Sequence, residues 1–410
     1  MQKRHVLTFI LSMAVAGSAS AAGYQLQEYS VTNLGRAFAG VGVMGDDYSA
    51  VAFNPAGMSL MNKSGVQMGA IAVDVYGKVK GTSQPKGMPV KSGSSHSNLF
   101  RLLPHFYGQK KVNDKLDLGI GLYVPYGLAN DYKNGWFGEE HAGYSGITTV
   151  DLTPSISYKV LDNLAVGVGL NLQYATAHLT GAVAGGGRTD MRADDMAVGY
   201  NVGLTWKPTQ TTRLGVSYRS KVNHKLEGKN KGQSAYVPFL NGKYPIYAKI
   251  TTPETVIFSA AQNLGQKWTL SGVARYTRWS RFETLDIYQK NKPTPGPLSR
   301  TYEKWRNTWL LGIGADYKYC KNLTFRFGTA WDNTAIRSPK YRTARIPDER
   351  RIWASIGATY TKNNWQFDVG YAHLFVHSAK AEHTAEDSGT FNAKYHIQSN
   401  ILGMGLQYKF

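Results

Sequence analysis

Cysteine, long apolar runs and charged residues are all scarce in this chain. Cys320 is the only cysteine among 410 residues, so neither an internal disulfide nor a cysteine-based metal site can form. Beyond the first residues, no segment has the roughly 18 consecutive apolar residues of a membrane-spanning helix, which excludes a helical membrane protein. Charged residues make up 18% of the chain, against about a quarter in soluble domains. A nucleophile motif such as G-x-S-x-G is also missing, so nothing indicates an enzyme.

The first residues have the pattern of an export signal. A basic start at Lys3 is followed by an apolar stretch over 6–17 and by Ala-Ser-Ala at 19–21, the small-residue site of signal peptidase. We therefore expect a signal peptide over residues 1–21 and cleavage after Ala21. Because Ala22 rather than cysteine follows, the signal is not that of a lipoprotein.

Basic residues outnumber acidic residues in the chain. There are 47 Lys and Arg against 27 Asp and Glu, which gives a formal net charge of +20. Such a surplus fits nucleic acid, anionic lipid or merely solvated loops. Export argues against nucleic acid, so we expect the cations of outer loops to meet the phosphates of lipopolysaccharide.

The remainder of the chain has an apolar period of two, which is typical of β-strands. The alternating segments run for roughly 10 to 18 residues, against about 5 or 6 in soluble sheets. Their second face is rich in Gly, Asn, Gln and Arg, as in the lumen of an outer-membrane barrel. The last segment shows the pattern most clearly, with Leu402, Met404, Leu406, Tyr408 and Phe410 on one face. Tryptophans at strand ends are expected to form the interfacial girdles: Trp206, Trp268, Trp279, Trp309 and Trp353.

Six short turn signals separate the alternating segments in pairs. They lie at 111–114, 161–163, 207–209, 263–265, 321–322 and 362–364. Six tight turns with both chain ends on the same side imply 14 strands, an even number as bacterial barrels require. We predict an all-β, 14-stranded antiparallel transmembrane barrel over residues 64–410. The expected strands are 65–80, 99–112, 115–129, 147–160, 163–180, 193–207, 211–228, 246–262, 266–290, 300–319, 322–337, 350–362, 365–380 and 393–410.

Residues 22–63 precede the first strand and do not alternate. They are rich in Gly and Ala and contain the turn signal Asn54-Pro55-Ala56. A piece this small could not fold alone, and a 14-stranded barrel encloses more space than its own side chains fill. We therefore expect this segment to be a hatch that plugs the barrel, which argues against a general porin.

Several motifs resemble the FadL-type family of outer-membrane transporters for long-chain fatty acids and other hydrophobic compounds. The resemblance covers nearly the whole mature chain and implies a 14-stranded barrel with an N-terminal hatch. The motifs that carry it are Ala22-Gly23-Tyr24-Gln25-Leu26, Leu34-Gly35-Arg36-Ala37-Phe38-Ala39-Gly40, Asp46-Asp47, Asn54-Pro55-Ala56, Tyr126-Gly127-Leu128-Ala129, Ile346-Pro347-Asp348 with Arg351-Ile352-Trp353, and the terminal Phe410.

The resemblance assigns roles to two short motifs. Asn54, Pro55 and Ala56 would be the part of the hatch that faces a gap in the wall, although an ordinary turn would have the same residues. Pro125, Tyr126 and Gly127 interrupt an otherwise regular strand, where proline removes a ladder hydrogen bond and glycine permits a bend. In the family this place carries an inward kink that opens a lateral window, whereas the bland alternative is a strand that ends at Tyr123. Tyr408 and Phe410 match the terminal signal for the barrel-assembly machinery.

A carboxylate ligand needs one or two cations beside an apolar tunnel. The resemblance places one head-group cation at Arg306, which could equally be a solvated lumen residue. The second such position falls on Gly181, for which Arg188 or Arg192 could substitute. Phe239 and Leu240 lie in an unusually apolar loop, which either receives hydrophobic ligand or packs onto the barrel mouth.

No metal or cofactor site emerges from the sequence. His373 and His377 share a strand face but lie about 13 Å apart, too far to chelate one ion. The function hypothesis is passive transport of long-chain fatty acids or similar hydrophobic compounds, with lateral exit and without catalysis. The alternatives are an aromatic or alkane hydrocarbon transporter on the same fold, a hydrophilic porin, and a lipid hydrolase.

Overall fold

The computed structural model describes residues 23–183, 186–234, 241–290, 296–385 and 388–410. The expected signal peptide over 1–21 lies outside these residues. Short helices precede the strands: α2 (Val31–Leu34), α3 (Ala50–Phe53) and η1 (Pro55–Leu60). Further along are η3 (Trp279–Arg281) and η4 (Pro339–Tyr341). Within the described residues, no helix combines the length and the apolar character needed to cross a membrane.

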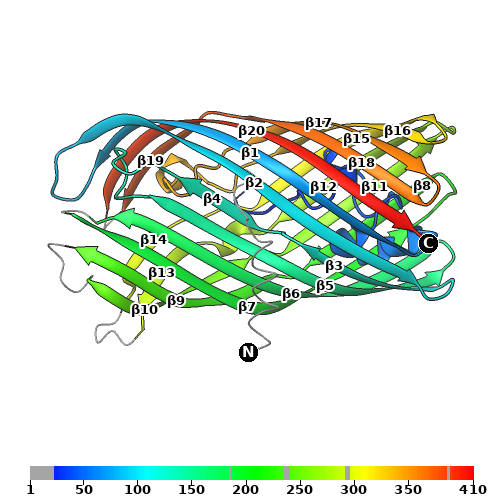
Figure 1. Cartoon of the computed structure of the whole chain (residues 1–410), viewed down its shortest axis with the longest axis horizontal. Helices are drawn as coiled ribbons and strands as arrows, with labels where there is room; N and C mark the ends of the chain where they lie inside the picture. Colours follow the sequence, from blue (N-terminus) through cyan, green and yellow to red (C-terminus); the bar gives the residue numbers. More distant parts are fainter. Residues whose placement is uncertain (1–22, 184–185, 235–240, 291–295, 386–387) are drawn as a thin grey trace.

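The strands form one closed antiparallel sheet (Figure 1). Their bounds are β1 (Gly65–Gln84), β2 (Lys91–Lys111), β3 (Leu116–Tyr123), β4 (Gly127–Asp131), β5 (Tyr144–Leu161), β6 (Leu164–Ala182), β7 (Gly187–Trp206), β8 (Thr212–Arg219), β9 (Val222–Ser234), β10 (Gly242–Thr252), β11 (Thr255–Leu264), β12 (Trp268–Thr277), β13 (Thr284–Gln289), β14 (Ser299–Tyr302), β15 (Thr308–Cys320), β16 (Leu323–Asp332), β17 (Arg351–Lys362), β18 (Trp365–Val376), β19 (Ala379–Ala385) and β20 (Gly389–Lys409).

These segments make a 14-stranded barrel. Six barrel strands consist of two segments each, namely β3/β4, β8/β9, β10/β11, β12/β13, β14/β15 and β18/β19. Each strand pairs with its sequence neighbour, and β20 pairs with β1 from Gly65↔Lys409 to Gln84↔Thr390 to close the sheet. The fold predicted from the sequence is confirmed, and all 14 expected strands have a counterpart. The interruptions were not predicted, because a two-residue period says nothing about where a ladder breaks.

The barrel has a short-turn end and a long-loop end (Figure 1). The predicted turn signals all fall between paired strands, for example at 162–163 between β5 and β6 and at 363–364 between β17 and β18. The C terminus lies at the same end. Several strands extend further toward the other end than predicted, such as β7, which begins at Gly187 rather than at residue 193.

Side chains alternate between lipid and lumen along each strand. On β20, Leu402 and Met404 point outward and are exposed, whereas Ile401 and Gln407 point inward and are buried. Trp206, Trp268 and Trp309 are exposed, as the girdle requires. The girdle prediction is wrong for Trp279 and Trp353, which are both 0% exposed. Both point into the lumen, where Trp279 packs against Tyr24 and Trp353 against Phe38.

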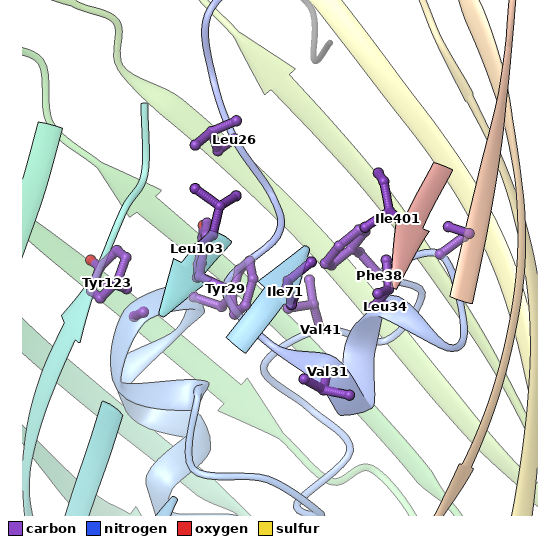
Figure 2. Packing of buried hydrophobic residues seen from close by; sticks show 14 of the residues in the cluster. Leu26, Tyr29, Val31, Leu34, Phe38, Val41, Ile71, Leu103, Tyr123 and Ile401 are labelled. Atoms are coloured by element: carbon purple, nitrogen blue, oxygen red, sulfur yellow. The ribbon is translucent and has the colours of Figure 1, made fainter. Parts of the chain in front are cut away.

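Residues 23–63, here called the N-terminal segment, lie inside the barrel toward the short-turn end (Figure 1). Most of their side chains are buried. Figure 2 shows Leu26, Tyr29, Val31 and Phe38 of this segment packed with apolar side chains of the wall, including Ile71, Leu103 and Ile401. The lumen of the barrel thus becomes a hydrophobic core, because the segment and the inward face of the wall bury each other.

Candidate functional site

Strand 3 of the barrel is interrupted beside β2. β3 ends at Tyr123 and β4 begins at Gly127. β2 pairs with β3 only from Phe106 to Lys111, and the ladder of β4 is with β5. On its other edge β2 pairs with β1, from Lys91 to Gln109. Within the described residues this leaves a stretch of wall between β2 and β4 without a ladder, spanned near its outer end by a hydrogen bond from Asp131 N to Ser97 Oγ (3.2 Å).

The beginning of the N-terminal segment pairs with this interruption. The amide of Leu26 donates to Pro125 O and that of Gly127 to Tyr24 O, both at 2.8 Å, and Gln25 forms an isolated bridge with Tyr126. A Cβ at position 127 would lie 2.9 Å from Leu26 Cδ1, so glycine permits the close approach. Pro125 O and the amide of Gly127 are therefore satisfied by the N-terminal segment instead of by β2.

Asn54, Pro55 and Ala56 lie elsewhere, against the paired wall of β6, β7 and β8. Asn54 Nδ2 donates to Leu204 O at 3.1 Å, and Ser157 Oγ donates to Ala56 O at 3.2 Å. Where it contacts these three residues, the wall is lined by glycines: Gly167, Gly203 and Gly215. A Cβ at position 167 or 203 would overlap Asn54 or Ala56, and a Cβ at position 215 would lie 3.0 Å from Asn54 Nδ2. Tyr24 to Leu26, and not Asn54 to Ala56, therefore adjoin the break in strand 3.

An apolar cavity of about 80 Å³ lies above the N-terminal segment. Tyr24 and Phe282 belong to an aromatic cluster at one side of it, with ring centroids 5.9 Å apart. Leu226 and Ile250 add apolar wall. The lining is almost wholly hydrocarbon, which suits an aliphatic or aromatic ligand.

Two charged side chains, Glu303 and Arg345, also line the apolar cavity. Glu303 is buried and accepts a hydrogen bond from Trp305 Nε1 at 2.9 Å. Arg345 Nη1 donates to Ser145 Oγ at 2.9 Å. A Cβ at Gly181 would lie 3.7 Å from Arg345 Nη2, so Arg345 brings a cation to the place where glycine supplies none.

Sequence reasoning missed Arg345 because it lies in an irregular segment far from Gly181 in the chain. The only signal in the sequence is that Arg345 directly precedes the motif Ile346-Pro347-Asp348. That motif indicated a family likeness and gave no hint of where the Arg345 side chain would reach.

Two further cavities adjoin the apolar one. An outer cavity of about 230 Å³ shares Leu179, Met191 and Arg345 with it. A third cavity, of about 50 Å³, shares Leu128 and Ile346 with it and reaches the inner face of β2. Together the three cavities lie in a row from the outer cavity to the inner face of β2.

The remaining predicted residues lie apart from these cavities. Arg306 is exposed, and its Nε donates to Thr334 O at 3.1 Å; it lines none of the cavities described above. Phe239 and Leu240 lie outside the described residues. The amide of Phe410 donates to Ser64 O at 3.0 Å, and the Tyr408 ring lies 6.0 Å from the Phe410 ring.

An ion-pair cluster fixes the N-terminal segment to the opposite wall. Arg36 Nη2 lies 2.9 Å from Asp46 Oδ1, and its Nη1 lies 2.8 Å from Asp316 Oδ2 on β15. Arg326 on β16 contacts the same two carboxylates at 3.3 Å. Burial favours the neutral acid, yet Arg36 and Arg326 lower the pKa of Asp46 below its usual range. No group of three or more potential metal ligands occurs among the described residues.

Comparisons with known proteins agree with this architecture. The family model described as "Outer membrane protein transport protein (OMPP1/FadL/TodX)" matches residues 12–410. The chain is 30% identical to the 47 kDa outer membrane protein of Pasteurella multocida, covering 97% of this chain and 96% of that one. It is 25% identical to the long-chain fatty acid transport protein of Escherichia coli K12, covering 98% of each.

Solved structures show the same fold. A FadL homologue of Pseudomonas aeruginosa superposes with a TM-score of 0.87 at 24% identity, over 95% of this chain and all of that one. The toluene transporter TodX of Pseudomonas putida gives a TM-score of 0.69 at 16% identity, over 89% of this chain and 94% of that one. The chain belongs to the OMPP1/FadL/TodX family of outer-membrane proteins that transport hydrophobic compounds, and its location is the bacterial outer membrane.

Proposed function

We propose that this protein carries long-chain fatty acids, or chemically similar hydrophobic carboxylates, passively across the outer membrane. The observation that carries the proposal is the apolar cavity with Arg345 in its lining. Hydrocarbon walls suit an alkyl tail, and a guanidinium suits a carboxylate head group. The E. coli relative named as a long-chain fatty acid transport protein supports the same cargo.

The route that we propose ends sideways in the membrane. Ligand enters the outer cavity, passes the apolar cavity and leaves through the unpaired wall between β2 and β4, beside Pro125, Tyr126 and Gly127. The N-terminal segment acts as a hatch over 22–63, with Asn54, Pro55 and Ala56 seated on glycines. Apolar burial and a concentration gradient drive transfer, with neither cofactor nor catalysis, because a fatty tail gains nothing by entering periplasmic water.

A hydrocarbon cargo is the second candidate. The apolar part of the cavity would accept toluene as well as an alkyl chain, and the family description includes TodX. The role of Arg345 distinguishes fatty acid from hydrocarbon cargo, because a cation stabilises a bound carboxylate and does not stabilise a neutral hydrocarbon. Replacing Arg345 by methionine should lower oleate uptake and leave toluene uptake unchanged if fatty acids are the cargo.

The route is tested by filling the cavity beside β2. Gly77 lines that cavity, and a Cβ there would have only Ile397 Cγ1 within 4 Å, at 3.8 Å. Gly77→Phe should lower uptake of labelled oleate by cells without their own transporter at least several-fold. Gly108→Phe, on the lipid face of β2, is the matched control. Normal uptake by a folded Gly77→Phe protein would refute the lateral route.

The outer surface carries a row of lysines that supports lipopolysaccharide as a partner. Lys80, Lys394 and Lys380 lie directly opposite one another on β1, β20 and β19, and all are exposed. Like charges in cross-strand register destabilise a sheet unless an anion lies between them. We propose that lipopolysaccharide phosphates meet this row. Tyr408 and Phe410 are proposed as the signal for the barrel-assembly machinery.

A further inference from the structure

A small cavity lined by Gln25 of the N-terminal segment contains a buried arginine that has no hydrogen-bonded counter-ion among the described residues. Arg275, on β12, is 2% exposed and points into the lumen. All three of its guanidinium nitrogens lack a hydrogen-bond acceptor in the part of the chain that the structure describes. Its guanidinium lies over the Phe53 ring, whose centroid is 5.8 Å from Arg275 Cζ. A buried charge without hydrogen bonds is costly, so this side chain calls for an anion.

A second guanidinium lines the same cavity. Arg219, at the end of β8, donates from Nη1 to Tyr123 Oη at 2.8 Å and pairs with Asp151. Arg219 therefore has a carboxylate in direct contact, whereas Arg275 has none among the described residues. The volume of about 20 Å³ exceeds the roughly 10–15 Å³ that one water needs and suits a group of carboxylate size.

Glu28 is the nearest candidate for an internal counter-ion, but its contacts do not fit that role. Its Oε2 accepts a hydrogen bond from the amide of Gln27 at 2.7 Å, and its Oε1 has no partner among the described residues. It attracts Arg351 and Arg275 without a direct ion pair to Arg275. Burial raises the pKa of Glu28, which weakens it further as an anion.

The cavity lies on the far side of a thin barrier from the apolar cavity. Tyr24 lines the apolar cavity, and Gln25 lines the small cavity that contains Arg275 and Arg219. Consecutive side chains of an extended segment point to opposite sides in this way. Gln25 is held by two side chains of the wall. Its Nε2 donates to Thr255 Oγ1 at 3.1 Å, and Thr277 Oγ1 donates to its Oε1 at 2.8 Å. Tyr24 and Gln25 thus lie between the two cavities.

We propose that Arg275 and Arg219 form a second anion site, which receives a carboxylate once the ligand has passed Tyr24 and Gln25. The inference rests on the proposed transport function for the source of that carboxylate, the head group of a fatty acid. A free carboxylate from solution has the same chemistry and is the other source. Arg345 thus provides a cation on the Tyr24 side of the N-terminal segment, and Arg275 provides one on the Gln25 side.

The test compares a fatty acid with its neutral counterpart. Cells expressing wild type, Arg275→Met, Arg275→Lys or the control Arg306→Met are given labelled oleate or labelled oleyl alcohol. Loss of charge-assisted hydrogen bonds should reduce oleate uptake by Arg275→Met about 10- to 100-fold and leave oleyl alcohol unchanged. Arg275→Lys should recover part of the oleate uptake. Heat-modifiable migration of each purified barrel establishes that it is folded.

A second arm tests the site without transport. The cavity is small, at about 20 Å³, so acetate rather than the bulkier benzoate is expected to raise the unfolding temperature of the purified wild-type protein, and Arg275→Met should abolish that rise. If Arg275→Met loses stabilisation by acetate but keeps normal oleate uptake, the anion site is supported and its ligand is a free carboxylate. If Arg275→Met keeps both acetate stabilisation and oleate uptake, the proposal is overturned. It is also overturned if Glu28→Gln loses oleate uptake and acetate stabilisation to the same extent as Arg275→Met. If wild type took up neither ligand, the transport function would fail while the acetate arm still decided the site.

Discussion

Replacing Arg36 by methionine is expected to loosen the N-terminal segment without unfolding the barrel. Arg36 is 0% exposed and neutralises Asp46 and Asp316 at 2.9 and 2.8 Å. Methionine fills nearly the same volume but leaves both carboxylates without their main partner. Breaking a buried ion pair by removing one member costs roughly 3–5 kcal/mol.

The lower end of that range applies here. Arg326 lies 3.3 Å from both carboxylates and stays in place, so part of their charge remains compensated. A loss of about 3 kcal/mol raises the equilibrium constant for local opening about 160-fold. We expect the cost to fall on the contact between segment and wall, because Asp316 is held in the backbone ladder of β15 and β16, to which the Arg36 side chain does not belong.

Hydrogen exchange followed by mass spectrometry in detergent micelles measures this opening. Peptides from residues 24–61 should lose protection by about two orders of magnitude, while peptides from β15 and β16 keep theirs. Arg300→Met is the control, since its pair with Asp286 is half-exposed and worth at most about 1 kcal/mol. Unchanged exchange in the segment, or equal loss throughout the barrel, would refute the view that this cluster is the anchor.

Two further predictions concern packing inside and outside the wall. Gly203→Ala should lower the free energy of unfolding by about 1–3 kcal/mol, because its Cβ would overlap Asn54 Oδ1. The midpoint of urea unfolding measures this loss. The control Gly272→Ala, whose Cβ would have only Gly312 O within 4 Å, at 3.8 Å, should leave the midpoint unchanged. In single-tryptophan variants, lipids brominated on the acyl chain should quench Trp309 and spare Trp279, since only the former is exposed on the barrel surface. Quenching of both would contradict the burial of Trp279.

The sequence predicted the elements well because strand geometry is local. An apolar period of two marks one face of a strand whatever lies beyond it, and residues such as Asn363, with φ of +56°, mark a tight turn. Gly and Ala without alternation marked the N-terminal segment as something other than strand. Strand number, closure and the plugged lumen follow from these local signals and from the volume that 14 strands enclose.

Positions inside the lumen could not be predicted in this way. Trp353 lies on the lumen face of β17 with Arg351 and Ser355, and only the tertiary structure shows that it packs there against Phe38 of the N-terminal segment. Arg306 seemed a head-group cation by resemblance, whereas the structure brings Arg345 into the cavity instead.

The sequence by itself determined the class of membrane protein, the number of strands and the existence of an internal segment. It did so because each depends on periodicity and turn chemistry within a few residues. The tertiary structure decided which charges meet, where the wall opens and what lines the cavities. Those outcomes depend on residues that are far apart in the chain, such as Gly181 and Arg345: a Cβ at position 181 would lie 3.7 Å from Arg345 Nη2.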